Sequence, residues 1–379
     1  MPSPDLELEA QRVLRLCAVC MYCDGLCPVF PALAGLRGDR PADRAHLANL
    51  ANLCHNCRAC WYDCQYAPPH VFAVNAPAVL ARLRRDSYAD HVWPRVLRPC
   101  FSRPGLGAAL MMVAALSTFA LIMAATQSSW VSLWTSHSGP GAFYAVAPLG
   151  LMAGLAGLSL LWAAVSILVS TLRFWRAISA GLDPVPLAPA LRVALVDIIT
   201  LRHLDGGGPG CHDSGPRFSR RRRVLHHLMA AGVLAAFAST LTAALYQHLL
   251  GLAPPFALKS LPVVLGLSGG VAIVAGAGGL LTLEATSDPE PSEPGETRLN
   301  IVFLLALEAV TLSGLAVLVW RESAAMGPLL VGHLSLVTGF FVGLPASKAM
   351  HAPFRAAALL RSALERRRGR VRADAAASE

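Results

Sequence analysis

The chain has 379 residues, of which 55% are hydrophobic and 15% are charged, whereas a soluble domain carries about a quarter charged residues. Residues 106–172 contain no Asp, Glu, Lys or Arg, which excludes an ordinary soluble fold. The formal net charge of +9 would suit nucleic acid, but its distribution favours basic loops beside membrane spans.

The first region, residues 1–104, holds nine of the ten cysteines, eight of them clustered, and twelve of the arginines. Its opening sequence, MPSPDLELEAQR, is acidic and polar, unlike a secretory signal, which needs a basic start followed by an apolar run. We therefore expect this region to stay on the cytoplasmic side of a membrane. Because that compartment is reducing, its clustered cysteines are expected to bind metal rather than form disulfides.

Two cysteine motifs of the form C-x2-C-x2-C-x3-C occur in this region, and the second repeats the first after 37 residues. Three closely spaced thiolates can bind one iron–sulfur cluster, and the fourth cysteine then ligates a second cluster, as in two-cluster ferredoxins. We predict two [4Fe–4S] clusters in an α-helical, ferredoxin-like module. The first cluster would be bound by Cys17, Cys20, Cys23 and Cys64, and the second by Cys54, Cys57, Cys60 and Cys27.

Zinc is the alternative metal, but zinc modules usually have two C-x2-C pairs separated by a longer span, which this chain lacks. The two remaining cysteines, Cys100 and Cys211, are interpreted as packing residues. The chain has no G-x-G-x-x-G motif after a strand, so we expect its electron donor to be another protein rather than a bound dinucleotide.

The second region, residues 105–351, is expected to form a six-helix transmembrane bundle, because six segments have the about 20 apolar residues that span a bilayer. These segments are Gly107–Thr126, Leu149–Leu172, Leu228–Leu250, Leu261–Leu283, Leu299–Trp320 and Pro328–Met350. An even number of spans places both ends of the chain on one side. Of the 32 lysines and arginines, all except Lys259 and Arg321 then fall on that side, which the positive-inside rule identifies as the cytoplasm.

Three further segments lie on the predicted cytoplasmic side. The run HLDGGGPGC at residues 203–211 is a Gly-rich loop, expected to cover a cofactor or to dock a partner. The acidic, Pro-rich sequence EATSDPEPSEPGETR at residues 284–298 is expected to be a solvated connector. Residues 352–379 form a basic, Ala-rich cytoplasmic tail.

Histidines lie near the ends of the third and sixth predicted spans, and histidine inside a membrane is costly and indicates function. The inner level has His226 or His227 and His351, and the outer level has His248 and His333. His333 and His351 are 18 residues apart, or five helical turns and ~27 Å, so they would share one face of the sixth span. Matching levels predict one or two b-type haems with bis-histidine ligation; alternatively, the histidines only lie at the headgroup interface.

One carboxylate, Glu308, lies inside the fifth predicted span, in the sequence NIVFLLALEAVTLSG. A carboxylate beside a redox site can carry protons to a quinone, and it is then part of the catalytic machinery. The alternative is a structural role, in which Glu308 pairs with an arginine or a backbone group.

Several stretches resemble the TcuB family of tricarballylate/citrate utilisation B proteins. They are CHNCRACWYDCQYAPPHVFAVNAP at 54–77, LRHLDGGGPGC at 201–211, RRRVLHHLMAAGVLAAFASTLTAALYQHLLG at 221–251 and RESAAMGPLLVGHLSLVTGFFVGLPASKAMHAPFRAAALLR at 321–361. The same family is similar to the C-terminal half of the CobZ protein of cobalamin synthesis. The spacing of His333 and His351 is also similar to that in the haem-binding helix of nitrate reductase gamma subunits.

The resemblance implies an inner-membrane iron–sulfur and haem protein that reoxidises the FADH2 of a cytoplasmic flavoprotein dehydrogenase and delivers the electrons to quinone. Such a chain is an electron-transfer subunit of an oxidoreductase system rather than a complete enzyme. Two alternatives are a CobZ-like relay that serves cobalamin synthesis and a zinc-binding membrane scaffold without redox function.

Overall fold

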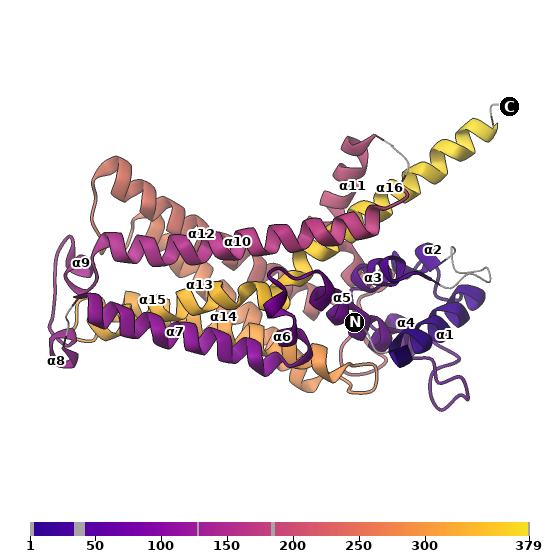
Figure 1. Ribbon diagram of the computed structural model, residues 1–379, viewed down its shortest axis with the longest axis horizontal. Coiled ribbons are helices and arrows are strands. Elements are labelled where there is room, and N and C mark those ends of the chain that lie inside the picture. Colours follow the sequence, from indigo (N-terminus) through magenta and orange to yellow (C-terminus); the bar gives the residue numbers. More distant parts are fainter. Residues whose placement is uncertain (1–3, 34–41, 127–128, 183–185, 378–379) are drawn as a thin grey trace.

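The computed structural model describes residues 4–33, 42–126, 129–182 and 186–377. The predicted mainly α fold is confirmed, with a cysteine-rich N-terminal part followed by long apolar helices. These helices run along the long axis of the molecule, and the N-terminal part packs against one end of them (Figure 1). Both chain ends lie toward that end, away from the short helices α8 (Trp130–Leu133) and α9 (Ala142–Val146).

The N-terminal part is built from short helices joined by cysteine-bearing loops. They are α1 (Pro4–Cys20), α2 (Val29–Ala32), α3 (Arg44–Leu53), α4 (Ala59–Tyr62), α5 (Ala76–His91), the 3-10 helix Arg95–Leu97 and α6 (Pro99–Ser102). Side-chain caps fix where α3 and α5 begin. Asp43 accepts a hydrogen bond from the amide of His46 at 2.7 Å, and Asn75 accepts one from the amide of Ala78 at 3.1 Å. Leucines such as Leu14, Leu50 and Leu80 form the buried core between them.

Six helices of the described residues are long and apolar enough to cross a membrane. They are α7 (Pro104–Thr126), α10 (Leu149–Ser179), α12 (Arg221–Leu250), α13 (Leu261–Thr286), α14 (Pro294–Trp320) and α15 (Met326–Gly343). Only 11% to 39% of each apolar window is buried within the protein. The remaining apolar side chains would face water in a soluble protein, so lipid is the environment that suits them.

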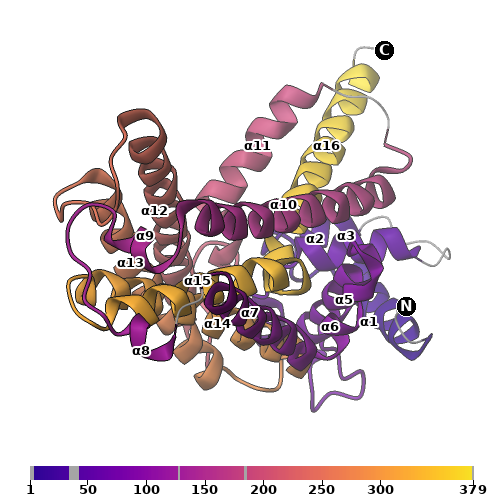
Figure 2. The ribbon, with the colours of Figure 1, turned by 60° about the vertical axis from the view of Figure 1, so that its left-hand side comes forward.

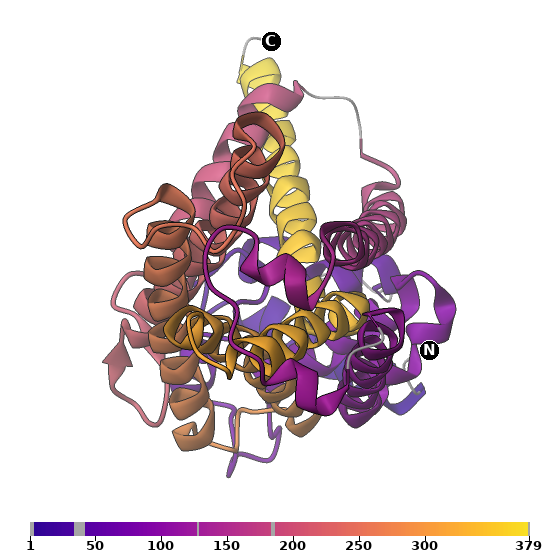
Figure 3. The ribbon, with the colours of Figure 1, turned by 90° about the vertical axis from the view of Figure 1, so that its left-hand side faces the viewer.

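Small residues let α12 and α13 pack closely. A Cβ atom added to Gly276 would lie 2.5 Å from the amide nitrogen of Met229, and one added to Gly232 would lie 2.7 Å from the carbonyl oxygen of Gly269. Glycine is therefore required at these positions, as at many helix interfaces in membranes. In the end-on view of Figure 3, the golden α15 lies between the purple helices α7 and α10 and the brown and orange helices α12–α14.

The sixth span differs from its prediction, because it does not continue to Met350. Helix α15 ends at Gly343 and is followed by 3-10 turns over Leu344–Ala346 and Lys348–Met350. Pro345 has no amide hydrogen to donate, and Ser347 is extended, with φ −124° and ψ −178°. A new helix, α16 (His351–Ala377), starts at His351. His333 and His351 therefore do not share one helix, and the prediction that they do is wrong.

The segments on the predicted cytoplasmic side are more ordered than expected. The basic tail belongs to α16, which packs against α11 (Leu187–Thr200) and points away from the bundle (Figure 2). A 3-10 helix, Arg202–Asp205, leads into a two-stranded hairpin. Its strands, β1 (Cys211–His212) and β2 (Phe218–Ser219), are antiparallel.

The prediction that residues 284–298 form a solvated connector is also wrong, because this acidic segment binds the arginine-rich N-terminal part. Tyr62 donates a hydrogen bond to the Asp288 carboxylate at 2.6 Å, and Arg58 donates one to the Ser292 hydroxyl at 2.9 Å. Asn75 donates to the carbonyl oxygen of Glu290 at 2.8 Å. These hydrogen bonds, together with the ion pair between Arg85 and Glu293 at 3.2 Å, hold the N-terminal part on the bundle.

Candidate functional site

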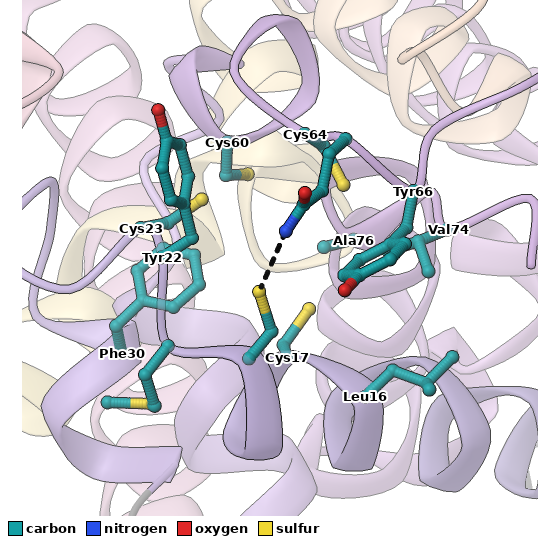
Figure 4. Close-up of a pocket in the computed structure, with 13 residues that line it drawn as sticks. Leu16, Cys17, Tyr22, Cys23, Phe30, Cys60, Cys64, Tyr66, Val74 and Ala76 are labelled. Carbon is teal, nitrogen blue, oxygen red and sulfur yellow. Dashed lines mark hydrogen bonds between the residues drawn. The ribbon is translucent and has the colours of Figure 1, made fainter. Parts of the chain in front are cut away.

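The eight clustered cysteines separate into two sets in space. Cys17, Cys20, Cys23 and Cys64 line one cavity, together with Tyr22, Tyr66 and Cys60 (Figure 4). Cys27, Cys54, Cys57 and Cys60 line a second cavity, which Cys17 also borders. Cys64 therefore lies with the first motif and Cys27 with the second, which is the exchange of fourth cysteines that the spacing predicts.

The electrostatic neighbours of the thiols give the same grouping. Burial and the nearby thiols of Cys64 and Cys20 raise the pKa of Cys17 to about 12. Burial likewise raises the pKa of Cys27 well above its usual value, and its nearest thiols are Cys57 and Cys54. Four thiols held so close resist ionisation without a cation, and an iron–sulfur cluster supplies that positive charge.

The two motifs also share a backbone feature. Met21 follows the second cysteine of the first motif with φ +49°, and Arg58, 37 residues later, follows the second cysteine of the other with φ +63°. A side chain rarely adopts a positive φ unless its surroundings require it. The sequence repeat is therefore a structural repeat, in which both loops turn in the same way around their thiols.

The two sets differ in how well they are covered. Cys54 and Cys57 are each 7% exposed, whereas Cys17, Cys20 and Cys23 are half-buried. The Gly-rich loop provides part of the cover over the second set, because the amide of His212 donates a hydrogen bond to the carbonyl oxygen of Cys57 at 2.9 Å. These three thiols of the first set are therefore closer to solvent than Cys54 and Cys57.

The two lone cysteines are both buried. Cys100 packs among aromatic and aliphatic residues near α6, whereas Cys211 packs against Cys57 and donates a hydrogen bond to the carbonyl oxygen of Leu204 at 2.8 Å. Within the described residues, no three His, Cys, Asp or Glu side chains converge closely enough to hold a single metal ion.

At the inner end of the bundle, the structure brings His226 and His351 together. Their ring centroids are 6.0 Å apart and the rings are nearly perpendicular, at 80°. Because a metal–nitrogen bond is about 2.0 Å long, this separation fits one metal ion between the two rings. His227 points elsewhere, since its Nε2 donates to the carbonyl oxygen of Ile199 at 3.0 Å. Of the two alternatives, His226 is thus the residue that faces His351.

The ring nitrogens of this pair are available for a ligand. Nδ1 of His351 donates to the carbonyl oxygen of Lys348 at 2.7 Å, which leaves Nε2 with its lone pair. Burial and the nearby Arg355 cation hold the pKa of His351 well below its usual value, so its imidazole is neutral. Nδ1 of His226 is buried and has no hydrogen-bond partner among the described residues.

A cavity of about 540 Å³ opens beside this histidine pair. Its lining is partly apolar, with Leu234, Leu280, Phe303 and Leu304, and partly charged and polar. The charged and polar residues include His55, Arg84, Asp197, Arg222, Glu284, Glu296, Lys348 and Arg355. An amphipathic, planar cofactor with an apolar body and acidic groups fits such a lining.

The cavity also adjoins the second cysteine set. His55 and Asn56, the residues between Cys54 and Cys57, line it directly. Arg84 and Arg355 line it too, and both donate to the carbonyl oxygen of Cys54, at 2.7 and 2.8 Å. No local sequence pattern indicates either arginine, because their partners are far away along the chain.

The outer histidines are not brought together in the same way. The His333 ring contacts α14, where the Ser313 hydroxyl lies 2.9 Å from Nδ1 and Gly314 faces the ring. His248 is exposed at the end of α12. Since α12 packs on α13, α13 on α14 and α14 on α15, two helices separate the outer half of α12 from α15. The predicted pairing of His248 with His333 at a second haem therefore fails.

Glu308 lies on α14 one helical turn beyond the cavity residue Leu304. Its carboxylate faces α13, where a Cβ added to Gly278 would lie 3.5 Å from Oε1. Oε1 is buried, and no described residue forms a hydrogen bond with it. Among the described residues, no arginine forms an ion pair with Glu308, whereas the backbone of Gly278, the other kind of partner that a structural role could use, lies beside the carboxylate.

The architecture and the paired cysteine motifs define a membrane protein with a ferredoxin-like domain. Comparison with known proteins agrees: residues 10–90 match the Fer4-like domain of Citrate utilization protein B, and residues 103–373 match the family model Citrate utilization protein B. The chain is 35% identical to Citrate utilization protein B of Escherichia coli over 366 residues, covering 96% of this chain and 94% of the relative. No solved structure matches the chain significantly. The chain belongs to the Citrate utilization protein B family, and the resemblance found from its motifs is confirmed.

Proposed function

We propose that this protein carries electrons from a partner flavoprotein to membrane quinone during the use of citrate or tricarballylate. Electrons from FADH2 would pass through two [4Fe–4S] clusters and one haem b before they reach quinone. One observation carries the proposal: a single cavity is lined both by the His226–His351 pair and by the residues between Cys54 and Cys57. A cofactor in that cavity would lie next to the second cluster.

The cluster assignments follow the two cysteine sets. Cys17, Cys20, Cys23 and Cys64 would hold the first cluster, and Cys54, Cys57, Cys60 and Cys27 the second. The thiols of each set surround a cavity and do not converge on one point, which suits a cluster several atoms across better than a zinc ion with bonds of about 2.3 Å.

The haem would be held by His226 and His351, and the bound haem would supply a one-electron carrier between cluster and quinone. The paired rings, their free nitrogens and the half-apolar, half-charged cavity support this assignment. Since His248 and His333 lie apart, we propose one haem rather than two.

The membrane arrangement is part of the proposal. We infer an inner-membrane protein with six spans and both termini in the cytoplasm, because the lysines and arginines lie at the end of the bundle where the N-terminal part packs. The two chain ends also lie toward that end (Figure 1). Reporter fusions after Ser138 and after Glu379 should then give opposite signals; equal signals would contradict the arrangement.

Glu308 is the proposed carrier of protons to quinone, since its buried Oε1 lies one turn beyond the cavity without a hydrogen-bond partner in the described part of the chain. Glu308→Gln should slow quinone reduction without changing the haem content, because Gln retains the shape of the side chain but cannot carry the proton. An unchanged rate would exclude the role.

The direct test is anaerobic purification of the full chain in detergent, followed by analysis of iron, acid-labile sulfide, zinc and haem. We expect iron and sulfide in the amounts of two [4Fe–4S] clusters, haem, and oxidation of the reduced protein by a quinone analogue. Zinc in place of iron and sulfide would overturn the proposal and favour a scaffold without redox function.

A further inference from the structure

Arg355 is a partly buried cation with no carboxylate within ion-pair distance among the described residues. Its Nε donates to the carbonyl oxygen of Asn52 at 3.3 Å and its Nη2 to that of Cys54 at 2.8 Å. Both acceptors are backbone carbonyls, and among the described residues no carboxylate forms an ion pair with this guanidinium. A partly buried cation without a nearby anion favours an acidic ligand.

The neighbouring cations cannot share an acid with Arg355. Arg84 and Lys348 both bind one carboxylate, that of Glu296, with the Arg84 contact at 2.9 Å. The Glu296 carboxylate is therefore already shared by two cations. Arg222, elsewhere in the lining, already has partners in Asp213 at 3.1 Å and Glu284 at 3.7 Å. The surplus positive charge is thus local to Arg355 and its neighbours.

Arg355 is also placed to reach a molecule held by the histidine pair. It follows His351 by four residues on α16, so both side chains lie on one face of that helix. Both residues line the same cavity. A molecule bound between His226 and His351 would therefore share this cavity with the guanidinium.

We propose that the ligand of this cavity carries at least one carboxylate group and that Arg355 binds that group. The choice of haem as the preferred ligand rests on the proposed function. With haem in the cavity, the carboxylate that Arg355 binds is one of the haem propionates. The same chemistry would also recognise a free polycarboxylate such as citrate. Because Arg355 also holds the carbonyl of Cys54, it would connect the cavity ligand to the cysteine loop of the second cluster.

The test uses the full chain in detergent, purified without haem and titrated with haem b or with its dimethyl ester, in which both propionates are blocked. The wild type should bind haem more tightly than the ester. Arg355→Gln should weaken haem binding roughly ten- to hundredfold and abolish the preference over the ester, whereas Arg355→Lys should retain part of it. Arg361→Gln is the matched control, because this arginine of the same helix pairs with Glu365 at 2.8 Å.

A parallel titration with citrate distinguishes the two sources of the carboxylate. If the wild type binds citrate in an Arg355-dependent way and shows no preference for haem over the ester, the ligand is a free polycarboxylate. If Arg355→Gln retains normal cluster content and binds haem, ester and citrate as the wild type does, the inference is wrong. Failure of the proposed function would give a different result. In that case the wild type would bind no haem, or its haem binding would persist in His351→Ala.

Discussion

The buried ion cluster of Arg84, Glu296 and Lys348 should be the main electrostatic connection between the N-terminal part and the bundle. Arg84 lies on α5, Glu296 at the start of α14 and Lys348 between α15 and α16. The side chains of Arg84 and Glu296 are 2% and 3% exposed, and their contact is 2.9 Å long. Removing the shared carboxylate would leave two buried cations without an anion, which costs about 3–5 kcal/mol in comparable cases.

Glu296→Gln tests this, because it keeps the shape and removes the charge. At about 2 °C per kcal/mol for a large domain, we expect an apparent Tm lower by roughly 6–10 °C, measured in detergent at one scan rate. Glu365→Gln removes a more exposed partner of Arg361 and should change the Tm by about 1 °C or less. Adding Lys348→Met to Glu296→Gln should recover part of the loss. If Glu296→Gln unfolds at the same temperature as Glu365→Gln, the reasoning is refuted.

Two further predictions concern the clusters and the helix packing. Cys64→Ser should remove the same cluster signal in electron paramagnetic resonance as Cys20→Ser, with about half of the iron lost. Cys60→Ser should remove the other cluster signal. Loss of the same signal in all three variants would contradict the grouping. Gly276→Val should lower the yield and Tm of the protein because its side chain would meet α12, whereas Gly157→Val, with no atom within 4 Å of its added Cβ, should not; equal behaviour would contradict the packing.

The sequence was sufficient for features that depend on local spacing. The cysteine motifs predict that Cys64 and Cys27 exchange clusters. The side chains of Cys64 and Cys27 line the cavities that this prediction requires, and the ligation itself stays a prediction. The apolar runs located the six long apolar helices of the described residues, because lipid imposes a simple length and composition.

Features that depend on distant contacts could not be predicted. The break before His351 falls in an apolar stretch, where Pro345 and the extended Ser347 end the helix, and hydropathy alone does not register it. Arg84 and Glu296 are 212 residues apart in the chain, so their pairing leaves no local pattern. The prediction that residues 284–298 are a solvated connector is wrong for the same reason, since the partners of this segment lie in the N-terminal part.

The central claim is that electrons leave the clusters through a cofactor held by His226 and His351. Its most direct test is to reduce the full chain anaerobically, mix it with a quinone analogue and follow the clusters by electron paramagnetic resonance. We predict that wild-type clusters and those of the control His333→Ala are oxidised, while those of His351→Ala remain reduced. Equally rapid oxidation of the clusters in His351→Ala would contradict the account.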